Sequence, residues 1–401
     1  MYIADLHIHS RFSRATSRDC DLPHLDWWAG KKGITLVGTG DFTHPVWRRE
    51  LKEQLVPAGD GVYKLRDGLR LEGAAEPAKF LVTGEISCIY KRDGKTRKVH
   101  HLILLPSLEA AEELSVRLEA VGNIHSDGRP ILGMDSRDLL ELTLETCPEA
   151  EFIPAHIWTP HFSMFGAFSG FDSIEDCFGS LSGHIHAAET GLSSDPPMNW
   201  RVSALDRLTL VSHSDAHSPG KLGREADLLE TGVSYPELIR AIRTGEGFYG
   251  TVEFFPEEGK YHLDGHRSCG VCLTPAETQA RNGRCPVCGK KLTIGVEHRV
   301  EALADRPAGM RPAGAKPFES LAPLPEVIAA STGVSAASKR TSALYTKMLD
   351  ALGPEFFILR EAPVSDIERT AGPCVAEGIR RLRLGEVERR PGFDGEYGVI
   401  S

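Results

Sequence analysis

The stretch YIADLHIHS, residues 2–10, decides the fold, because an apolar strand here ends in three potential metal ligands, Asp5, His7 and His9. Alternate side chains of a strand lie on one face, so His7 and His9 can bind the same ion. Other apolar runs in the first half of the chain end in the same way. Their candidate ligands are Asp41 after ITLVGTG, Glu85 after FLVTG, His100 and His101 in KVHHLILL, His156 after EFIPA, Glu189 after HIHAA, and His213, Asp215 and His217 after LTLVS. This recurrence, more than any single run, predicts a metal site.

Helical patterns lie between these runs. They are LPHLDWWAGKKG at 22–33, VWRRELKEQL at 46–55, SLEAAEELSVRLEAVG at 107–122 and SRDLLELTLE at 136–145. Alternation of strands and helices is typical of a parallel α/β fold. In a parallel barrel the reactive groups gather at the carboxyl ends of the strands. The sequence therefore predicts a parallel barrel with a metal site at one rim, and its imidazole and carboxylate ligands suit zinc, manganese or iron.

Composition places the chain among soluble proteins. Its 401 residues are 41% hydrophobic and 25% charged, which is typical of a globular protein with two or three domains. No apolar run approaches the ~20 residues of a membrane span, and the candidate site follows Met1 with no secretory signal. We therefore expect a cytoplasmic protein, associated with the nucleoid if it binds DNA, and no membrane partner.

Charge is distributed unevenly along the chain. The net charge of −10 does not favour a general nucleic-acid binder. Between Arg306 and Lys347, however, six basic residues stand against two acidic ones, and they include the adjacent pair Lys339 and Arg340. This excess indicates a local DNA-binding surface or, equally well, an ordinary solvated face.

Four of the nine cysteines have the spacing of a zinc site. Cys269-Gly-Val-Cys272 and Cys285-Pro-Val-Cys288 are two CxxC pairs separated by twelve residues. Two such turns complete a tetrahedral structural zinc site with four cysteine ligands. Free thiols or a redox pair are the alternative. The other five cysteines are scattered and read as small buried hydrophobic residues.

The order of the barrel motifs resembles the polymerase and histidinol phosphatase (PHP) superfamily. The motifs are Asp-Leu-His-Ile-His at 5–9, Thr39-Gly40-Asp41, Glu85, His101, His156 and Ser214-Asp215-Ala216-His217. The resemblance implies a distorted (β/α)7 barrel that holds two or three divalent metals (Zn²⁺, Mn²⁺ or Mg²⁺) and cleaves phosphoesters.

The resemblance also implies how the ligands are shared. One metal would take His7, His9, Glu85 and Asp215, a second would share Glu85 with His101 and His156, and a third would take Asp41 and His217. Phe42 departs from the family, which commonly has His there, and this puts the third metal in doubt. His100 and His101 lie on one strand and only one can face the interior; the family pattern favours His101, which directly precedes LILL.

A narrower resemblance, to the endonuclease Q family, covers almost the whole chain. It is carried by GTGDFTHP, RKVHHLILLPSLE, PAHIWTP, FDSIEDCFG, GLSSD, SDAHSPGKLGRE, GKYHLDGHRSCGVC and CPVCGKKLTIGVEHRV. It implies a PHP barrel over residues 1–250, a Cys₄ zinc module over 251–305, and a linker with a helical DNA-binding domain over 306–401. It also implies nicking on the 5′ side of uracil, hypoxanthine, xanthine and abasic sites, leaving a 3′-hydroxyl and a 5′-phosphate.

Within that reading, Glu85 and Asp215 carry the catalytic metals, and Arg224 is a candidate phosphate clamp. Glu189 and Asp195 lie where a further strand end would meet the site. The aromatic loop after His156 (Trp158, Phe162, Phe165, Phe168 and Phe171) is either a pocket for an extruded base or a plug over the barrel mouth. The expected partner is DNA with deaminated bases or abasic sites, together with possible replication or repair factors.

Two other functions compete with this one. A small-molecule phosphatase of the histidinol-phosphate kind would use the same metals but needs neither a zinc module nor a basic tail. A non-catalytic PHP scaffold or DNA-binding subunit would show a depleted metal centre, towards which Phe42 is a small step.

Overall fold

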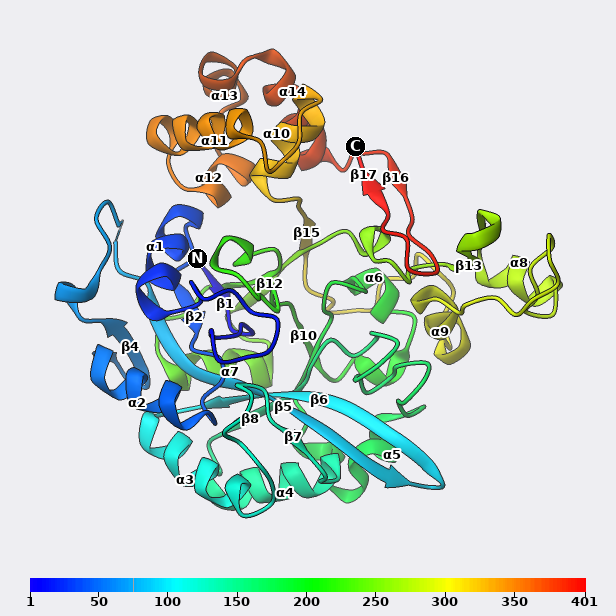
Figure 1. The fold of residues 1–401 in the computed structure, drawn as a ribbon, viewed down its shortest axis with the longest axis horizontal. Coiled ribbons are helices and arrows are strands. Elements are labelled where there is room, and N and C mark those ends of the chain that lie inside the picture. Colours follow the sequence, from blue (N-terminus) through cyan, green and yellow to red (C-terminus); the bar gives the residue numbers. More distant parts are fainter. Residues whose placement is uncertain (75) are drawn as a thin grey trace.

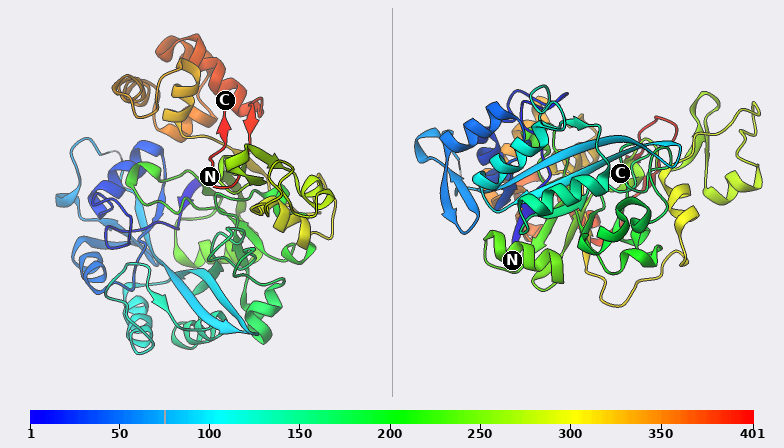
Figure 2. Two further views of the ribbon diagram at one scale, coloured as in Figure 1. Left: turned by 45° about the vertical axis from the view of Figure 1, so that its right-hand side comes forward. Right: turned by 90° about the horizontal axis from the view of Figure 1, so that it is seen from below.

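The computed structural model describes residues 1–74 and 76–401. A mixed α/β domain forms the body, a smaller module at residues 264–303 projects from one side, and a bundle of short helices lies on another (Figure 1). The smaller module is called the zinc module after its predicted ligand. The right-hand view of Figure 2 shows that the zinc module extends away from the body. The long β5–β6 hairpin crosses the body in both views of Figure 2. In the described residues, no helix is long and apolar enough to cross a membrane.

The main sheet has 11 strands. They are β1 (Tyr2–Asp5), β2 (Leu36–Gly38), β3 (Leu55–Gly59), β4 (Val62–Leu65), β5 (Lys79–Arg92), β6 (Lys95–Leu105), β7 (Ile131–Leu132), β8 (Glu151–Pro154), β11 (Ala226–Leu229), β12 (Phe248–Glu253) and β15 (Phe318–Ser320). A separate parallel pair is formed by β9 (Ala187–Glu189) and β10 (Thr209–Val211). Strands β1, β2, β8 and β9, which precede candidate ligands, are buried, as their apolar sequences require, whereas β10 is partly exposed at Thr209 and Leu210.

The observed strand pairing differs from the parallel barrel that the alternation of strands and helices in the sequence predicts. Strands β1, β2 and β5 pair in parallel, but β5–β6, β6–β8, β1–β11 and β11–β12 are antiparallel. The β9–β10 pair contacts the segment after β8 through Ile157 N, which donates to Glu189 O at 3.0 Å. The segment after β10 contacts the segment after β1, where His9 N donates to Ala216 O at 3.0 Å. The observed architecture is thus a mixed α/β fold, and the strand ladder does not show the closed (β/α)7 barrel that we expected.

The antiparallel β5–β6 hairpin is the main source of this difference. Asp93 and Gly94 form its two-residue turn with φ of 52° and 72°, the left-handed conformations that an Asp-Gly hairpin turn requires. The hairpin sets the register Ile86↔His101 and Ser87↔His100. Because strand side chains alternate between faces, this register decides which histidine shares a face with Glu85.

Helices cover the outside of the sheet. They are α1 (Leu22–Lys32), α2 (Pro45–Gln54), α3 (Leu108–Glu119), α4 (Ser136–Thr146), α5 (Ile174–Phe178), α6 (Pro196–Asn199) and α7 (Tyr235–Thr244). Helix α3 begins where the sequence pattern predicted, because Ser107 Oγ accepts a hydrogen bond from Ala110 N at 3.1 Å and caps the helix. Short 3₁₀ turns are η1 (Asp67–Leu69), η2 (Gly179–His184), η3 (Ser203–Leu205), η4 (Pro219–Lys221), η5 (Pro256–Glu258) and η6 (Arg267–Cys269).

The zinc module and the helical bundle are both tied to the body. The module contains β13 (Asp264–His266), β14 (Val271–Leu273), α8 (Pro275–Ala280) and α9 (Val296–Leu303); the bundle contains α10 (Leu324–Thr332), α11 (Lys339–Leu352), α12 (Glu355–Arg360), α13 (Val364–Ala371) and α14 (Pro373–Leu384). The chain ends in the hairpin β16 (Arg389–Arg390) and β17 (Val399–Ile400). A buried ion pair, Lys32 Nζ to Glu355 Oε2 at 3.1 Å, joins α1 to the bundle.

Segments also cross the domain limits expected at residues 250 and 305. Strand β12 runs through residue 250 and pairs in parallel with β15, which belongs to the last third of the chain. The C-terminal tail returns to the zinc module, where Leu263 N donates to Gly392 O at 3.0 Å and Thr293 Oγ1 to Asp394 Oδ1 at 2.6 Å. These contacts tie the C-terminal tail to the zinc module and the last third of the chain to the main sheet.

Candidate metal centre

Backbone strain marks the ends of the site strands. Asp41, His156 and Asp215 have φ of 51°, 30° and 47°, in the left-handed region that residues with a Cβ rarely adopt. Such conformations persist only where the surroundings enforce them, and they gather at functional sites. All three residues follow strands that the sequence identified as carrying ligands.

The first donor group contains His7, His9, Glu85 and Asp215, whose ligand atoms all lie within 4.8 Å of one another. His9 Nε2 is 3.0 Å from Asp215 Oδ1 and 3.3 Å from Glu85 Oε2. His7 Nε2, His9 Nε2 and Asp215 Oδ1 are buried and have no hydrogen-bond partner among the described residues. Buried polar atoms that converge without hydrogen bonds need another partner, and two imidazoles with two carboxylates fit a divalent cation.

The second donor group contains Glu85, His100 and His156. His100 Nδ1 lies 2.6 Å and His156 Nε2 3.0 Å from Glu85 Oε1, whereas Glu85 Oε2 faces the first group. Glu85 can therefore bridge two ions, one on each oxygen. Paired ions of this kind are used in enzymes that cleave phosphodiesters.

His100 stands where His101 was predicted. Glu85 and Ser87 share one face of β5, and the hairpin register pairs Ser87 with His100 and Ile86 with His101. His101 points to the opposite face, where Nε2 lies 2.8 Å from Ser136 Oγ and the ring packs against Phe152. The prediction rested on the neighbouring LILL, but the pairing register decides the face.

Two other predicted ligands orient the histidines instead. Asp41 lies 3.0 Å from His9 Nδ1, and its second oxygen accepts from Ser10 N at 2.8 Å and Ser13 Oγ at 2.9 Å. Glu189 lies 3.0 Å from His7 Nδ1 and accepts from the backbone N–H of His156 at 2.8 Å. Carboxylates in this position fix the tautomer and the orientation of ligand histidines.

The predicted third metal set is not assembled in the described residues. Neither Asp41 nor His217 belongs to a donor group. His217 Nδ1 lies 2.9 Å from the backbone oxygen of Asp215, and its ring centroid is 4.5 Å from that of His9. His217 therefore borders the first group at its solvent side.

The electrostatics fit a cation site. Burial by itself would lower the pKa of His7, but Glu189 and Glu85 raise it well above the usual value. Burial would raise the pKa of Glu85, but His100, Arg129 and His7 hold it well below the usual range. Burial lowers the pKa of His100 to about 4, so this imidazole is neutral near pH 7, the form that binds metals.

Arg129 is a functional candidate that sequence reasoning missed. Its Nη1 donates to Glu85 Oε2 at 3.0 Å, and the residue lines the cavity above the donor groups. A single arginine in a loop carries no signal of its own in the sequence. Arg224, the predicted clamp, donates instead to Ser214 O at 3.2 Å and lines a neighbouring cavity. Asp195 accepts from Met198 N at 3.0 Å and caps α6, outside the donor groups.

The zinc module brings together His266, Cys269, Cys285 and Cys288, so one ligand differs from the prediction. Cys288 Sγ lies 3.6 Å from His266 Nδ1, and Cys272, in β14, is outside the group. Burial would raise the pKa of Cys285, but the backbone N–H groups of the following turn lower it to about 7, which favours the thiolate that binds zinc. The CxxC spacing identified the two turns. The path of the backbone around the first turn decides that His266, and not Cys272, is the fourth member of the group.

The aromatic loop after His156 divides into two parts. Trp158, Phe165 and Phe171 are at most 2% exposed and pack in the core, as a plug would. Phe162 is half-buried, with its ring centroid 4.8 Å from that of His100, and Phe168 is 59% exposed. The plug interpretation therefore holds for three of the rings, and two remain at the surface of the site.

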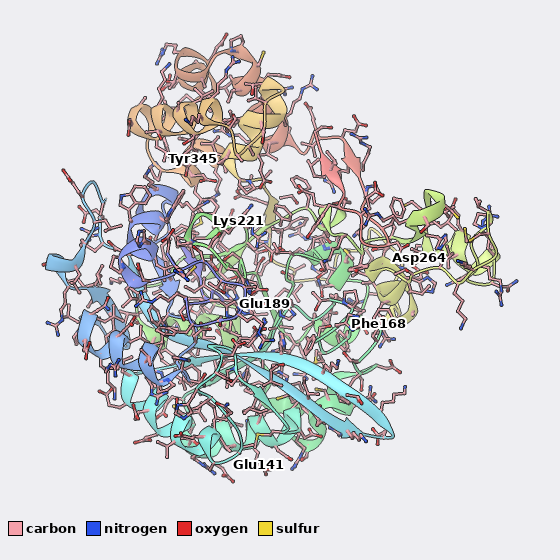
Figure 3. All side chains as sticks on the ribbon, in the orientation of Figure 1. Glu141, Phe168, Glu189, Lys221, Asp264 and Tyr345 are labelled. Atoms are coloured by element: carbon pink, nitrogen blue, oxygen red, sulfur yellow. The ribbon has the colours of Figure 1, made fainter. Side chains whose placement is uncertain are left out.

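Two adjoining cavities open at the donor groups. The metal cavity has a volume of about 390 Å³, and its walls include His100, Arg129, His156 and Asp215. A side cavity of about 590 Å³ shares Thr159, His161, Leu192 and Ser193 with it and continues to Arg224, Tyr261 and His262. In Figure 3, Glu189 marks the centre of the body, Lys221 lies towards the bundle, and Phe168 lies towards the zinc module that carries Asp264.

Known structures match the whole chain. The lesion-specific endonuclease PfuEndoQ from Pyrococcus furiosus aligns with a TM-score of 0.87 and 32% identity over 100% of this chain and 94% of that one. An endonuclease Q complex with a 27-mer duplex, which has an abasic lesion at the active site, aligns with a TM-score of 0.85 and 32% identity over 100% and 96%.

Sequence relatives agree with these matches. The uncharacterized protein YqxK of Bacillus subtilis is 29% identical over 418 residues, covering 99% of this chain and 98% of its own length. The uncharacterized protein MJ0043 of Methanocaldococcus jannaschii is 32% identical over 252 residues, 61% of this chain, but the match spans only 31% of MJ0043. Residues 323–386 match the MJ0043 C-terminal domain family.

A mixed α/β fold with two donor groups that share one glutamate agrees with the metal-dependent phosphoesterase class that the sequence motifs resemble. The two endonuclease Q structures are 32% identical to the chain over its full length, which identifies the family within this class. The chain belongs to the endonuclease Q family, as its sequence motifs predicted.

Proposed function

We propose that the protein is a metal-dependent DNA repair endonuclease that nicks on the 5′ side of deaminated bases and abasic sites, leaving a 3′-hydroxyl and a 5′-phosphate. The single observation that carries this proposal is the pair of donor groups sharing Glu85 at the mouth of a cavity. Its likeness to an endonuclease Q bound to an abasic duplex supports DNA as the partner.

The chain's own residues have distinct parts in the reaction. Two divalent cations, when bound, supply Lewis acidity and charge neutralisation for an in-line displacement at phosphorus. His7, His9 and Asp215 would hold one ion, His100 and His156 would hold the other, and Glu85 belongs to both donor groups. Arg129 already contacts Glu85 and lines the cavity, so it is placed to bind the non-bridging oxygens of the scissile phosphate.

The side cavity fits an extruded nucleotide. Its volume of about 590 Å³ falls in the range of ligand sites, roughly 300–1,000 Å³. Arg224 Nε and His262 Nδ1 are buried there without hydrogen-bond partners among the described residues. Deamination replaces an amino group with a keto oxygen, so a site that offers N–H donors accepts the deaminated base and opposes the normal one.

The proposal also assigns the remaining parts of the chain. The four-ligand site around Cys285 would hold a structural zinc, and the bundle with Lys339 and Arg340 would bind the DNA backbone. Possible contacts with replication or repair factors stay a prediction from the sequence.

One assay separates this function from its rivals. The protein with Mn²⁺ or Mg²⁺ is incubated with a uracil-containing duplex, with an undamaged duplex of the same sequence, and with p-nitrophenyl phosphate. We expect a nick only in the first, at the 5′ side of uracil, and none after EDTA treatment. Hydrolysis of the phosphomonoester alone would identify a small-molecule phosphatase. Binding of the duplexes with no nick in any metal would identify a scaffold.

A further inference from the structure

Phe168 is an exposed aromatic ring beside the metal cavity. It is 59% exposed, and its ring stacks on that of His161 with centroids 4.6 Å apart and planes within 15°. His161 lines both the metal cavity and the side cavity. A single exposed phenylalanine is unremarkable in itself. This one is distinguished by its support, a ring that belongs to the boundary between the two cavities.

The loop holds Phe168 firmly without burying it. Phe168 N donates to Pro160 O at 3.1 Å. A Cβ at Gly166 or Gly170 would come within 2.6 Å and 2.5 Å of neighbouring atoms, so the loop is wound too tightly for other residues. From the zinc module, Arg299 donates to Phe165 O at 2.9 Å and braces the loop from α9. The ring is therefore preorganised at the surface, which lowers the entropic cost of using it in binding.

We propose that Phe168, backed by His161, inserts into the DNA stack at the position that the extruded nucleotide leaves, an inference that rests on the proposed endonuclease function. Extruding a nucleotide breaks its stacking on both neighbours. An aromatic ring that enters the gap restores stacking, and it does so for any sequence because every base has a π-face.

This role explains how one site serves dissimilar lesions. Uracil, hypoxanthine and an abasic sugar share no common base for a pocket to grip, but each leaves the same gap in the helix when its nucleotide is extruded. A ring that occupies the gap stabilises the extruded state whatever the pocket receives. Lys98, with Nζ 5.2 Å from the Phe162 ring on the same rim, adds positive charge beside this position for the DNA backbone.

The test compares substrates that need extrusion with one that does not. Nicking by the full-length protein with Mn²⁺ is measured on uracil in a perfect duplex and on the same uracil inside an unpaired bubble. We expect Phe168→Ala to slow the duplex reaction about five- to a hundredfold, the range of one aromatic–base stack, and to leave the bubble reaction within about twofold of wild type. Phe168→Trp should retain the duplex rate. Val116→Ala, at an apolar residue of α3 that is also 59% exposed, is the control and should change neither rate.

A second measurement follows the DNA directly. A 2-aminopurine placed next to uracil should brighten when wild-type protein binds in Ca²⁺, and should brighten less with Phe168→Ala because fewer nucleotides are extruded. Equal losses on duplex and bubble, or no loss on either, would overturn the inference. Absence of any nick by wild-type protein on both substrates would instead overturn the proposed function, so the two failures are distinguishable.

Discussion

The two candidate metal sites differ in what holds their ligands in place. In the α/β domain, His7, His9 and Glu85 are at most 1% exposed. Glu85 lies in β5, the two histidines follow the end of β1, and Asp41 supports His9 through a hydrogen bond. In the zinc module, His266 ends β13, the three cysteines lie on turns, and Cys288 is exposed. Among the described residues, the local core of buried side chains consists of Leu273, Cys285 and Leu292. We infer that the fold prepares the first site before an ion binds, whereas the second depends on its ion for structure.

Removal of zinc should have the largest effect, and it tests whether the two sites differ in their dependence on a bound ion. Structural zinc contributes on the order of 10 kcal/mol to small modules, so a chelator should unfold the segment around residues 262–296 while the α/β domain keeps its structure. We expect proteolysis confined to that segment and a nearly unchanged far-ultraviolet circular dichroism spectrum. A module that resists protease after zinc has left would contradict the dependence we infer.

A second experiment asks which residue, His266 or Cys272, is the fourth ligand of the zinc site. The structure groups His266 with three cysteines, so His266→Ala should lose zinc affinity and Cys272→Ala should retain one equivalent. X-ray absorption distinguishes one nitrogen and three sulfur neighbours from four sulfurs. Cys285→Ala serves as the positive control for loss. Retention of zinc by His266→Ala with loss in Cys272→Ala would restore the Cys₄ set that the spacing predicted.

Glu85→Ala should give the largest effect on chemistry. Loss of the bridging carboxylate removes a ligand from both groups, and each ion supplies several kcal/mol, so nicking should fall on the order of a thousandfold or more. Because the centre is built on strands, the melting temperature and the affinity for uracil duplex should change little. Glu141→Ala, at an exposed site of α4, is the control. Substantial nicking by Glu85→Ala would end the assignment.

His100 and His101 offer an internal comparison of adjacent residues. His100→Ala should lower metal affinity in the second group about ten- to a hundredfold, by the scale of disrupted metal ligation, and nicking should fall with it. His101→Ala should instead lower stability by opening a cavity beside Phe152 and leaving Ser136 with one partner fewer. Metal titration by calorimetry and thermal unfolding separate the two effects. The reverse assignment of effects would show that the hairpin register differs in the active protein.

Part of both sites could be predicted from the sequence alone. The i, i+2 spacing was enough to place His7 and His9 in one donor group, although both follow the end of β1. Apolar runs located His156 and Asp215 beyond strand ends, and Glu85, which lies within the long β5 rather than at its end, joins them. Such inferences need only local geometry.

The remaining features depend on long-range pairing. The choice of His100 follows from the antiparallel register of β5 and β6, whose Asp93-Gly94 turn was a visible but unused signal. The mixed ladder in place of a parallel barrel has the same origin. Arg129 carries no spacing motif, and only the folded chain brings it to Glu85. His266 stands three residues before Cys269, but the two CxxC pairs were the stronger pattern in the sequence.

The smallest effect we predict concerns the bundle, and it tests whether DNA binding is separate from chemistry. Lys339 and Arg340 are exposed on the first turn of α11, and neither forms an ion pair with a residue that the structure describes. Each phosphate contact from Lys or Arg releases counterions, which gives a slope of about −0.9 in log affinity against log salt. Replacing both with Ala should therefore flatten the slope by roughly one to two units.

Because phosphate contacts carry no base information, this double variant should lose affinity equally for undamaged and uracil-containing duplexes. Fluorescence anisotropy over a salt series measures both slopes. Replacing Arg380 and Arg381 with Ala is the matched control, since these exposed arginines of α14 are already paired with Glu377 and are less free to bind phosphate. If the Lys339 and Arg340 variant kept its affinity but stopped discriminating uracil, these residues would belong with the side cavity, and the bundle would take part in lesion recognition itself.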